Sequence, residues 1–176
     1  FEQFEGLGGN DTIDGGAIDL LTQGNANRAS YQSATSSVIA DMGTGIVQDG
    51  LGGTDTIVNI NYIRGGNLAD TIYGSDTTLW TETLEGRGGN DLLDGRGGID
   101  VVRYDGAGSA VTVNFATGTA FDGQGGTDTL VGIEGVRGSG FGDNLIGSDT
   151  SGTPNAIEFF VGMAGNDTID GGGGFD

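Results

Sequence analysis

Residues 86–94 read GRGGNDLLD, and residues 95–103 continue at once with GRGGIDVVR. Both stretches fit the nine-residue pattern G-x-x-G-x-D-x-U-x, in which U is a large aliphatic residue. Glycine adopts positive φ and lets carbonyl groups turn inwards without a Cβ in the way, as tight, ligand-lined turns require. The triplet x-U-x predicts a short strand with one inward side chain. The stretch therefore predicts a turn and a strand, twice over.

The pattern recurs along the chain. Its sixth position is filled by Asp11, Asp19, Asp55, Asp70, Asp91, Asp100, Asp128, Asp143, Asp167 and Asp176. Its eighth position is aliphatic wherever it is present, at Ile13, Leu21, Ile57, Ile72, Leu93, Val102, Leu130, Leu145 and Ile169. Units of this kind stack so that their aliphatic side chains form an internal ladder. We therefore predict an all-β fold, a right-handed parallel β-roll or β-helix solenoid.

A longer repeat of about 76 to 80 residues organises these turns. The segment Glu5–Asp14, EGLGGNDTID, matches Glu85–Asp94, EGRGGNDLLD, and a third copy begins at Gly162. We expect one repeat solenoid over residues 1–176, with long units at about 1–80 and 81–159 and the start of a third unit at 160–176. Because the sequence stops inside a motif, we read it as a fragment of a longer protein.

Composition excludes several classes of function. The chain has 39 glycines, 25 acidic and six basic residues, no cysteine and no histidine, and its net charge is −19. Disulfides, thiolate or imidazole metal sites and histidine or cysteine catalysis are therefore excluded, so any bound metal must have oxygen ligands. The negative charge argues against nucleic acids and anionic membranes as partners, and no apolar run is long enough for membrane insertion. The charge favours cations instead.

Stacking brings the sixth-position aspartates of neighbouring coils together. Two carboxylates about 5 Å apart repel by about 3 kcal/mol at an effective dielectric near 20. A hard divalent cation removes that repulsion, and aspartate carboxylates with glycine carbonyls are the ligand set that Ca²⁺ prefers. The pattern thus predicts several calcium ions between the stacked turns.

These motifs resemble the RTX family, the hemolysin-type calcium-binding nonapeptide repeats. The resemblance implies a calcium-filled parallel β-roll, secreted by the type I route from a Gram-negative-type bacterium and folding when it meets calcium outside the cell. It implies that the sixth-position aspartates bind calcium together with backbone carbonyls of the preceding glycines. The glycines in question are Gly6, Gly9, Gly50, Gly53, Gly86, Gly89, Gly95, Gly98, Gly123, Gly126, Gly162, Gly165, Gly171 and Gly174.

Some turns depart from the family pattern. The turn that ends at Asp19 is one residue short, and those ending at Asp70 and Asp143 carry Leu68 and Phe141 in place of the fourth glycine, which indicates packing turns. The ninth position is also acidic in five turns, and for these residues a calcium-binding role and a solvent-facing role both stay open. They are Asp14, Asp49, Asp94, Asp122 and Asp170.

Two kinds of segment lie between the glycine turns. Residues 37–48 and 110–121 align at an offset of 73 and alternate apolar with polar residues, which predicts longer strands that extend the same solenoid. The stretch Leu20–Arg28 has no counterpart in the second unit, and we interpret it as a surface loop.

The sequence favours a non-enzymatic role, as the rigid spacer or scaffold of an extracellular adhesin, toxin or exoenzyme. An alternative is a filament or surface-layer segment, in which neighbouring repeats or whole copies associate end to end. A polysaccharide-active β-helix enzyme is a weaker alternative, because the repeat accounts for nearly every aspartate and leaves no separate catalytic group.

Overall fold

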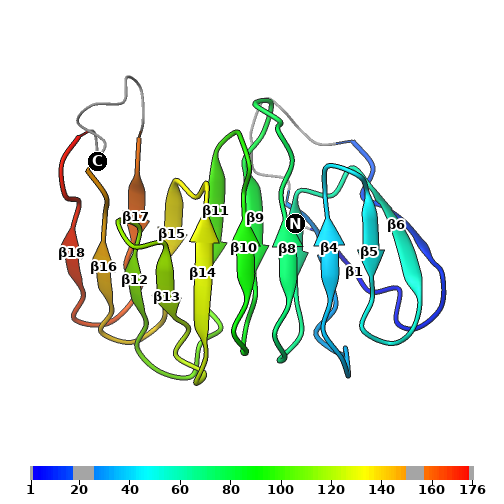
Figure 1. Ribbon diagram of the computed structural model, residues 1–176, viewed down its shortest axis with the longest axis horizontal. Helices are drawn as coiled ribbons and strands as arrows, with labels where there is room; N and C mark the ends of the chain where they lie inside the picture. Colours follow the sequence, from blue (N-terminus) through cyan, green and yellow to red (C-terminus); the bar gives the residue numbers. More distant parts are fainter. Residues whose placement is uncertain (1, 18–25, 150–156, 175–176) are drawn as a thin grey trace.

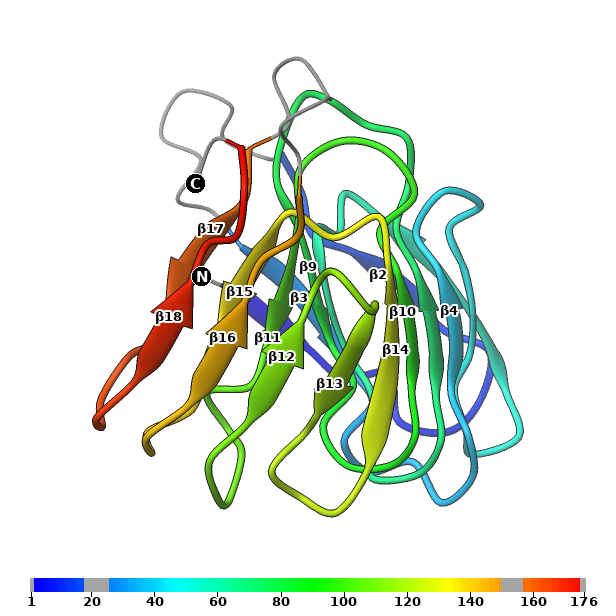
Figure 2. The ribbon, with the colours of Figure 1, turned by 60° about the vertical axis from the view of Figure 1, so that its left-hand side comes forward.

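The computed structural model describes residues 2–17, 26–149 and 157–174. Every regular element in these ranges is a β-strand, which confirms the all-β prediction. The strands form two sheets that face each other across one core, as Figure 1 and Figure 2 show from two directions. The described ranges contain no helix long and apolar enough to cross a membrane.

The two sheets differ in size. The smaller sheet has seven parallel strands in the spatial order β1 (Glu2–Phe4), β3 (Asn27–Ser30), β7 (Tyr62–Arg64), β9 (Glu82–Glu85), β11 (Asp100–Arg103), β15 (Gly135–Arg137) and β17 (Phe159–Val161). The larger sheet has eleven strands in the spatial order β2 (Thr12–Asp14), β6 (Thr54–Val58), β5 (Ile46–Gln48), β4 (Ile39–Asp41), β8 (Thr71–Tyr73), β10 (Leu92–Asp94), β14 (Thr127–Val131), β13 (Thr119–Phe121), β12 (Thr112–Asn114), β16 (Asn144–Ile146) and β18 (Thr168–Asp170).

The chain moves back and forth between the sheets as it advances. Along the sequence, β7, β9 and β11 fall in the smaller sheet and alternate with β8 and β10 of the larger one. Neighbours from successive passes pair in parallel, for example β8 with β10 and β9 with β11. The adjacent nonapeptides of residues 86–103 therefore lie in different sheets, β10 in the larger and β11 in the smaller.

Two hairpins stand where the sequence predicted longer strands. Residues 37–48 and 110–121 are strands, but each stretch folds back on itself as β4–β5 and β12–β13, with antiparallel pairing. The second strand of each hairpin then pairs antiparallel with β6 or β14. The hairpin turns contain Gly45 and Gly118, which have φ of 71° and 64° and so permit the tight reversal. The two extra strands at each hairpin account for the difference between eleven and seven.

The core is the predicted aliphatic ladder. Ile72, Leu93 and Leu130 stand at the centres of three neighbouring strands and pair in register. Ile72 and Leu93 are fully buried, and each contributes about 1.5–3 kcal/mol relative to exposure. Ile169 occupies the same motif position but is 49 % exposed, because β18 is the last strand of its sheet. Leu21 lies outside the described residues.

The interpretation of Leu20–Arg28 as a surface loop is wrong for its last residues. Asn27 and Arg28 belong to β3 and are buried. Asn27 donates its backbone N–H to Asn61 Oδ1 at 2.9 Å, and the guanidinium of Arg28 lies 5.1 Å from the ring centroid of Tyr62. These partners come from a later pass of the chain, so no local pattern indicated them.

Candidate metal centre

Seven of the ten predicted aspartates lie in one row along the larger sheet, which we call the aspartate column. The two hairpins divide it into three stacks: Asp11 with Asp55, then Asp70, Asp91 and Asp128, then Asp143 with Asp167. Each of these residues precedes a strand of that sheet or lies within its first two residues. Asp100 belongs to β11 of the smaller sheet instead. Asp19 and Asp176 lie outside the described residues. The sequence thus predicted that these aspartates stack, but it did not predict the interruptions at the hairpins or the separate place of Asp100.

One carboxylate oxygen of each inner column member accepts a backbone hydrogen bond from the neighbouring coil. Asp55 Oδ1 accepts from the Asp11 N–H at 2.9 Å, Asp91 Oδ1 from the Asp70 N–H at 2.8 Å, and Asp128 Oδ1 from the Asp91 N–H at 3.1 Å. Asp167 accepts in the same way from Asp143. These bonds hold each linked pair of carboxylates on neighbouring strands, which lie about 4.8 Å apart.

The second oxygen divides the column into two groups. In Asp11, Asp55 and Asp91 the Oδ2 atom is buried without a hydrogen-bond partner. In Asp70 both oxygens are occupied, by the backbone N–H groups of Val38 and Gly66.

Asp143 resembles Asp70 in having both oxygens occupied. It accepts from the N–H of Val111, and the N–H and hydroxyl of Ser139 also donate to it. Asp70 and Asp143 are the two members whose turns lack the fourth glycine, and backbone N–H groups reach both of their oxygens. In Asp128 the second oxygen accepts from the hydroxyl of Tyr104 instead.

Two of the five ninth-position aspartates join the column, once in each long unit. Asp49 Oδ1 accepts from the N–H groups of Leu51 and Gly53, and its buried Oδ2 has no partner. In the same way, Asp122 Oδ1 accepts from the N–H groups of Gln124 and Gly126, and its buried Oδ2 has no partner. Asp14 and Asp170 are exposed. The sequence left these roles open because each of the five residues stands directly before the first glycine of a following turn.

A glycine carbonyl lies close to the unpartnered Oδ2 atom of Asp49 and of Asp122. A methyl group added at Gly53 would lie 1.7 Å from the carbonyl oxygen of Gly9 and 2.8 Å from Asp49 Oδ2. At Gly126 the corresponding distances are 1.7 Å to Gly89 O and 2.7 Å to Asp122 Oδ2. Gly53 and Gly126 are therefore required for close approach, and the carbonyls of Gly9 and Gly89 lie beside unpartnered carboxylates.

Six of the other predicted carbonyl ligands fall into two sets. The carbonyls of Gly50 and Gly123 already accept hydrogen bonds, from Ser36 and from Ser109. Those of Gly86, Gly95, Gly162 and Gly171 lie beside the glycine of an adjacent coil and near an acidic side chain there: Gly65 with Asp70, Gly74 with Glu82, Gly138 with Asp143, and Gly147 with Glu158.

Two tyrosines stand at the same sites, and sequence reasoning missed them. Tyr104 donates its hydroxyl to Asp128 Oδ2 at 2.9 Å, and Tyr31 lies buried beside Asp55. They are 73 residues apart, which is the offset that relates Asp49 to Asp122. That shared offset was the one available signal. Burial raises the pKa of both hydroxyls, and the nearby aspartate charge adds to the effect.

Several carboxyl groups of the column have raised pKa values, so the fold favours removal of their negative charge. Burial raises the pKa of Asp91 to about 8; the hydrogen bond from Asp70 opposes this, and the charge of Asp128 adds to it. Burial also raises the pKa of Asp128, to about 6, although hydrogen bonds from Asp91 and Tyr104 lower it. Burial raises the pKa of Asp55 as well. Carboxyls that resist ionisation without a counterion are those that a bound cation would stabilise most.

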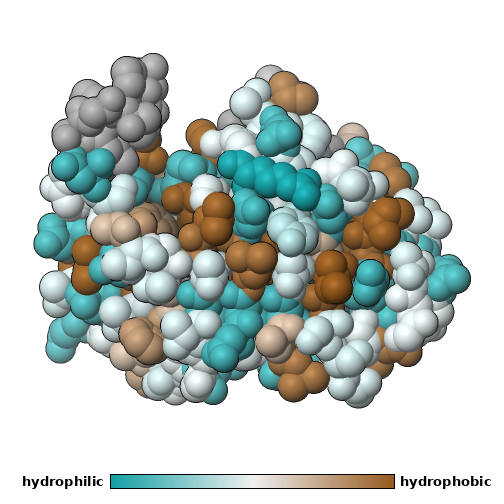
Figure 3. Space-filling view, viewed as in Figure 1, coloured by the Kyte–Doolittle hydropathy of each residue, from teal (hydrophilic) through white to brown (hydrophobic). Residues whose placement is uncertain are grey.

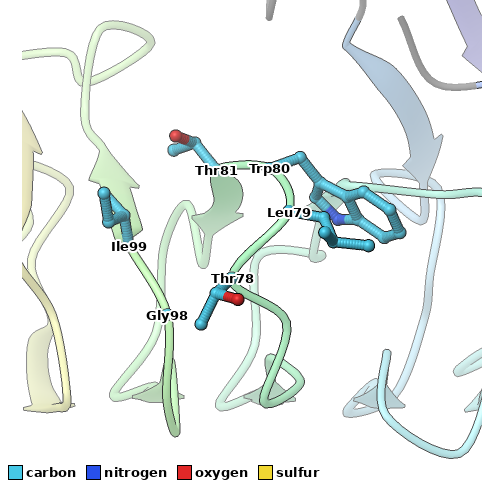
Figure 4. A pocket seen from close by; sticks show the side chains of 6 residues that line it. All are labelled: Thr78, Leu79, Trp80, Thr81, Gly98 and Ile99. Atoms are coloured by element: carbon cyan, nitrogen blue, oxygen red, sulfur yellow. The ribbon is translucent and has the colours of Figure 1, made fainter. Parts of the chain in front are cut away.

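The residues present fit a calcium ion. Among residues 2–17, 26–149 and 157–174, no three acidic side chains come close enough to hold a metal ion by themselves. An ion would therefore depend on glycine carbonyls as much as on carboxylates, which suits calcium with its six to eight oxygen ligands. A pocket of about 270 Å³ beside Trp80 (Figure 4) has no carboxylate in its lining.

A comparison with models of known protein families finds no match, and a search of curated proteins finds no significant similarity.

Proposed function

We propose that this chain is a calcium-binding β-roll module that folds on binding calcium outside the cell and serves as a rigid, non-catalytic scaffold of a secreted bacterial protein. The observation that carries the proposal is the set of buried carboxylate oxygens without partners, each beside a glycine carbonyl or a second carboxylate. The set occurs in both long units, with Asp49 and Asp55 in one and Asp122 and Asp91 in the other.

Burying such groups costs free energy unless something compensates them. Bound calcium supplies positive charge and accepts the spare oxygens as ligands. The chain's own residues hold those oxygens in place: the backbone N–H groups of Leu51 and Gly53 orient Asp49, and the Asp11 N–H orients Asp55. The site is thus formed by the folded coils and is absent from an extended chain.

Extracellular calcium concentrations suit such a switch. Extracellular modules bind calcium with Kd values of about 10⁻⁴–10⁻³ M. At about ten times Kd, each ion adds about 1.4 kcal/mol by mass action. Several ions together match the usual folding free energy of about 5–15 kcal/mol. At cytosolic calcium the contribution nearly vanishes, and the chain stays unfolded and competent for type I export.

The test is calcium-dependent folding. In chelator, the far-UV circular dichroism spectrum should be that of a disordered chain, and millimolar calcium should restore the β signal while magnesium does not. An unchanged spectrum in chelator would refute the proposal.

A pair of variants makes this test specific: Asp49→Asn changes the site, and Asp14→Asn is its control. The amide at residue 49 keeps an oxygen for the Leu51 and Gly53 N–H groups and removes the spare carboxylate oxygen, so the calcium concentration needed for folding should rise severalfold. Asp14 is exposed and occupies the same motif position in another turn, so Asp14→Asn should behave as the wild type.

A second candidate function is an end-to-end assembly. In the described residues, β17 is an edge strand of the smaller sheet and β18 is an edge strand of the larger one. The side chains of Val161, Met163 and Ile169 are exposed at these edges. Unpaired edges are templates for further strands. Light scattering that rises with calcium would favour the filament, and a monomer at all calcium concentrations would exclude it.

A further inference from the structure

Four of the six arginines gather on the outer face of the smaller sheet. The inward side chains of its central strands are fully buried in the core; they are Ala29, Ile63, Leu84, Val102 and Val136. Because side chains alternate along a strand, the residues on either side of each of these stand on the outer face. Arg28 stands there on β3, Arg64 on β7, Arg103 on β11 and Arg137 on β15. The fold thus brings together arginines that are scattered along the sequence.

Two neighbouring arginines of this face share one carboxylate. Arg64 Nε donates to Glu85 Oε2 at 2.8 Å, and Arg103 donates to both oxygens of Asp105, at 2.9 and 2.6 Å. Arg137 pairs in register with Arg103, but its Nε atom lies 3.9 Å from Asp105 Oδ2 and has no hydrogen-bond partner in the described ranges. The side chain of Arg137 is 40 % exposed. Its guanidinium group therefore remains accessible to a carboxylate from outside the chain.

Aromatic rings lie among these arginines. The guanidinium carbons of Arg28 and Arg103 lie 5.1 and 5.2 Å from the ring centroid of Tyr62, which holds both side chains against the sheet. The ring of Phe159 covers the backbone of Gly135, where an added methyl group would lie 2.1 Å from it. Arginine and aromatic residues are enriched at protein–protein interfaces. The outer face of the smaller sheet therefore has the composition of an interface.

The outer face of the larger sheet is acidic and apolar. Asp14, Asp94 and Asp170 stand on it, and the four ion pairs of the described ranges do not include them. Arg96 is on the same face, where it pairs with Asp41 at 2.7 Å. Five large apolar side chains are 42–59 % exposed between these charges: Ile39, Ile46, Val58, Phe121 and Val131. Figure 3, drawn from the same side as Figure 1, shows apolar patches among polar ones.

The two outer faces are complementary and point in opposite directions, because the sheets face each other across one core (Figure 2). Their strands have the same spacing of about 4.8 Å, and stacked sheets pack about 10 Å apart. The net charge of −19 opposes association at long range. At 0.1 M salt, however, the Debye length is about 10 Å, so the side chains that meet across a contact dominate there. A second copy supplies both negative charge and apolar side chains, whereas a nucleic acid supplies mainly charge.

We propose that the outer face of the smaller sheet docks onto the outer face of the larger sheet of a second copy of this chain, so that copies stack side by side. Arg103 and Arg137 meet the aspartates of the second copy, and Phe159 meets its exposed aliphatic side chains. The contact joins two different faces, so a stack can grow at both sides. It uses the faces of the sheets and not their edge strands, so it goes beyond the end-to-end assembly and the calcium-dependent folding described above.

The test is sedimentation velocity of the whole chain in calcium, over a series of protein concentrations. Association of the wild type should weaken severalfold between about 0.1 M and about 1 M sodium chloride, where the Debye length falls from about 10 Å to about 3 Å. Arg137→Glu should weaken it severalfold at the lower salt concentration. Arg87→Glu is the matched control, because it changes the charge equally in a glycine turn outside both sheets, and it should behave as the wild type.

A mixing experiment tests that two different faces meet. Arg137→Glu changes the smaller-sheet face and leaves the larger-sheet face intact, and Asp94→Arg does the reverse. Each variant alone should be largely monomeric, whereas the mixture should form pairs, because each variant supplies the face that the other has lost. Val131→Arg, at an exposed position in register with Asp94, serves if Asp94→Arg does not fold. Circular dichroism in calcium reports the folding of each variant.

Several outcomes would overturn the lateral contact. A folded wild-type chain that is monomeric at every protein concentration refutes it, and so does an equal effect of Arg137→Glu and Arg87→Glu. Association that Ile169→Asp at the edge strand removes and Arg137→Glu leaves intact would indicate end-to-end pairing instead. If the chain folds equally well in chelator and still stacks through Arg137, the lateral contact stands and the proposed function fails.

Discussion

Asp91 combines two roles within one carboxylate. Its Oδ1 accepts the Asp70 N–H and so contributes to the stacking of coils, while its buried Oδ2 is left for a ligand. Asp100 has no such bond on either oxygen. Burial raises the pKa of each to about 8, well above the value of about 3.9 expected in an unfolded chain. Protons and cations therefore compete for the same groups.

Acid should stabilise the calcium-free chain. Because the folded-state pKa values are raised, the protonated carboxyls contribute stability that is full below about pH 4 and is lost as the pH rises towards about 8. In chelator, the β signal of the circular dichroism spectrum should be larger at about pH 5 than at about pH 8. Circular dichroism over a series of pH values measures this, and a β signal that grows with pH in chelator would contradict it.

Gly53 is predicted to tolerate no side chain. The methyl group of Gly53→Ala would lie 1.7 Å from Gly9 O and would displace Asp49 Oδ2, so we expect a loss of about 1–3 kcal/mol and weaker calcium binding. Gly140→Ala is the matched control, because nothing lies within 4 Å of its added methyl group. Urea denaturation in calcium compares the two, and equal stabilities would show that the close approach at Gly53 is unimportant.

At the scale of elements, most three-residue strands contribute one inward aliphatic side chain. The strands are too short to be stable alone, and their register with neighbours creates the core. Figure 3 shows one face of the molecule, where apolar residues form separate patches among polar ones. The hydrophobic stabilisation therefore comes from the interior ladder.

Truncation of the eighth-position aliphatic residue should lower the free energy of unfolding by different amounts in different strands. Leu93→Ala empties a fully buried position at the centre of β10 and should cost about 2–5 kcal/mol. Ile169→Ala changes the equivalent residue of β18, which is half exposed, and should cost less than about 1 kcal/mol. Urea denaturation of both variants in calcium checks this, and similar losses would argue against the ladder as the core.

At the scale of the whole molecule, charge opposes folding. The net charge is −19, and the four ion pairs of the described ranges involve four of the six arginines but only three acidic residues, Asp41, Glu85 and Asp105. Self-repulsion of this size destabilises a compact state and is screened by salt, with a Debye length of about 10 Å at 0.1 M. Screening reaches exposed charges, whereas the buried aspartates need a bound ion.

Monovalent salt should therefore rescue the calcium-free chain only in part. Adding sodium chloride to the chelated protein should restore a small part of the β signal, and calcium at equal ionic strength should restore most of it. Circular dichroism at matched ionic strength tests this. An equal effect of the two salts would mean that calcium acts only by screening.

The sequence by itself determined the local features. A nine-residue pattern specifies where the backbone turns and which side chain of each strand points inwards, because glycine conformations and strand alternation operate within one motif. It also placed the departures at Asp70 and Asp143, whose turns lack a glycine. The all-β class, the ladder and most of the aspartate column follow from these local rules.

Only the tertiary structure decided which coils meet. Asp11 and Asp55 are 44 residues apart, and Asp91 and Asp128 are 37 apart, so their contacts depend on the order of stacking. The antiparallel hairpins and the tyrosines beside the column arise in the same way. The physical reason is that a repeat encodes one coil, whereas a binding site between coils takes its oxygens from several.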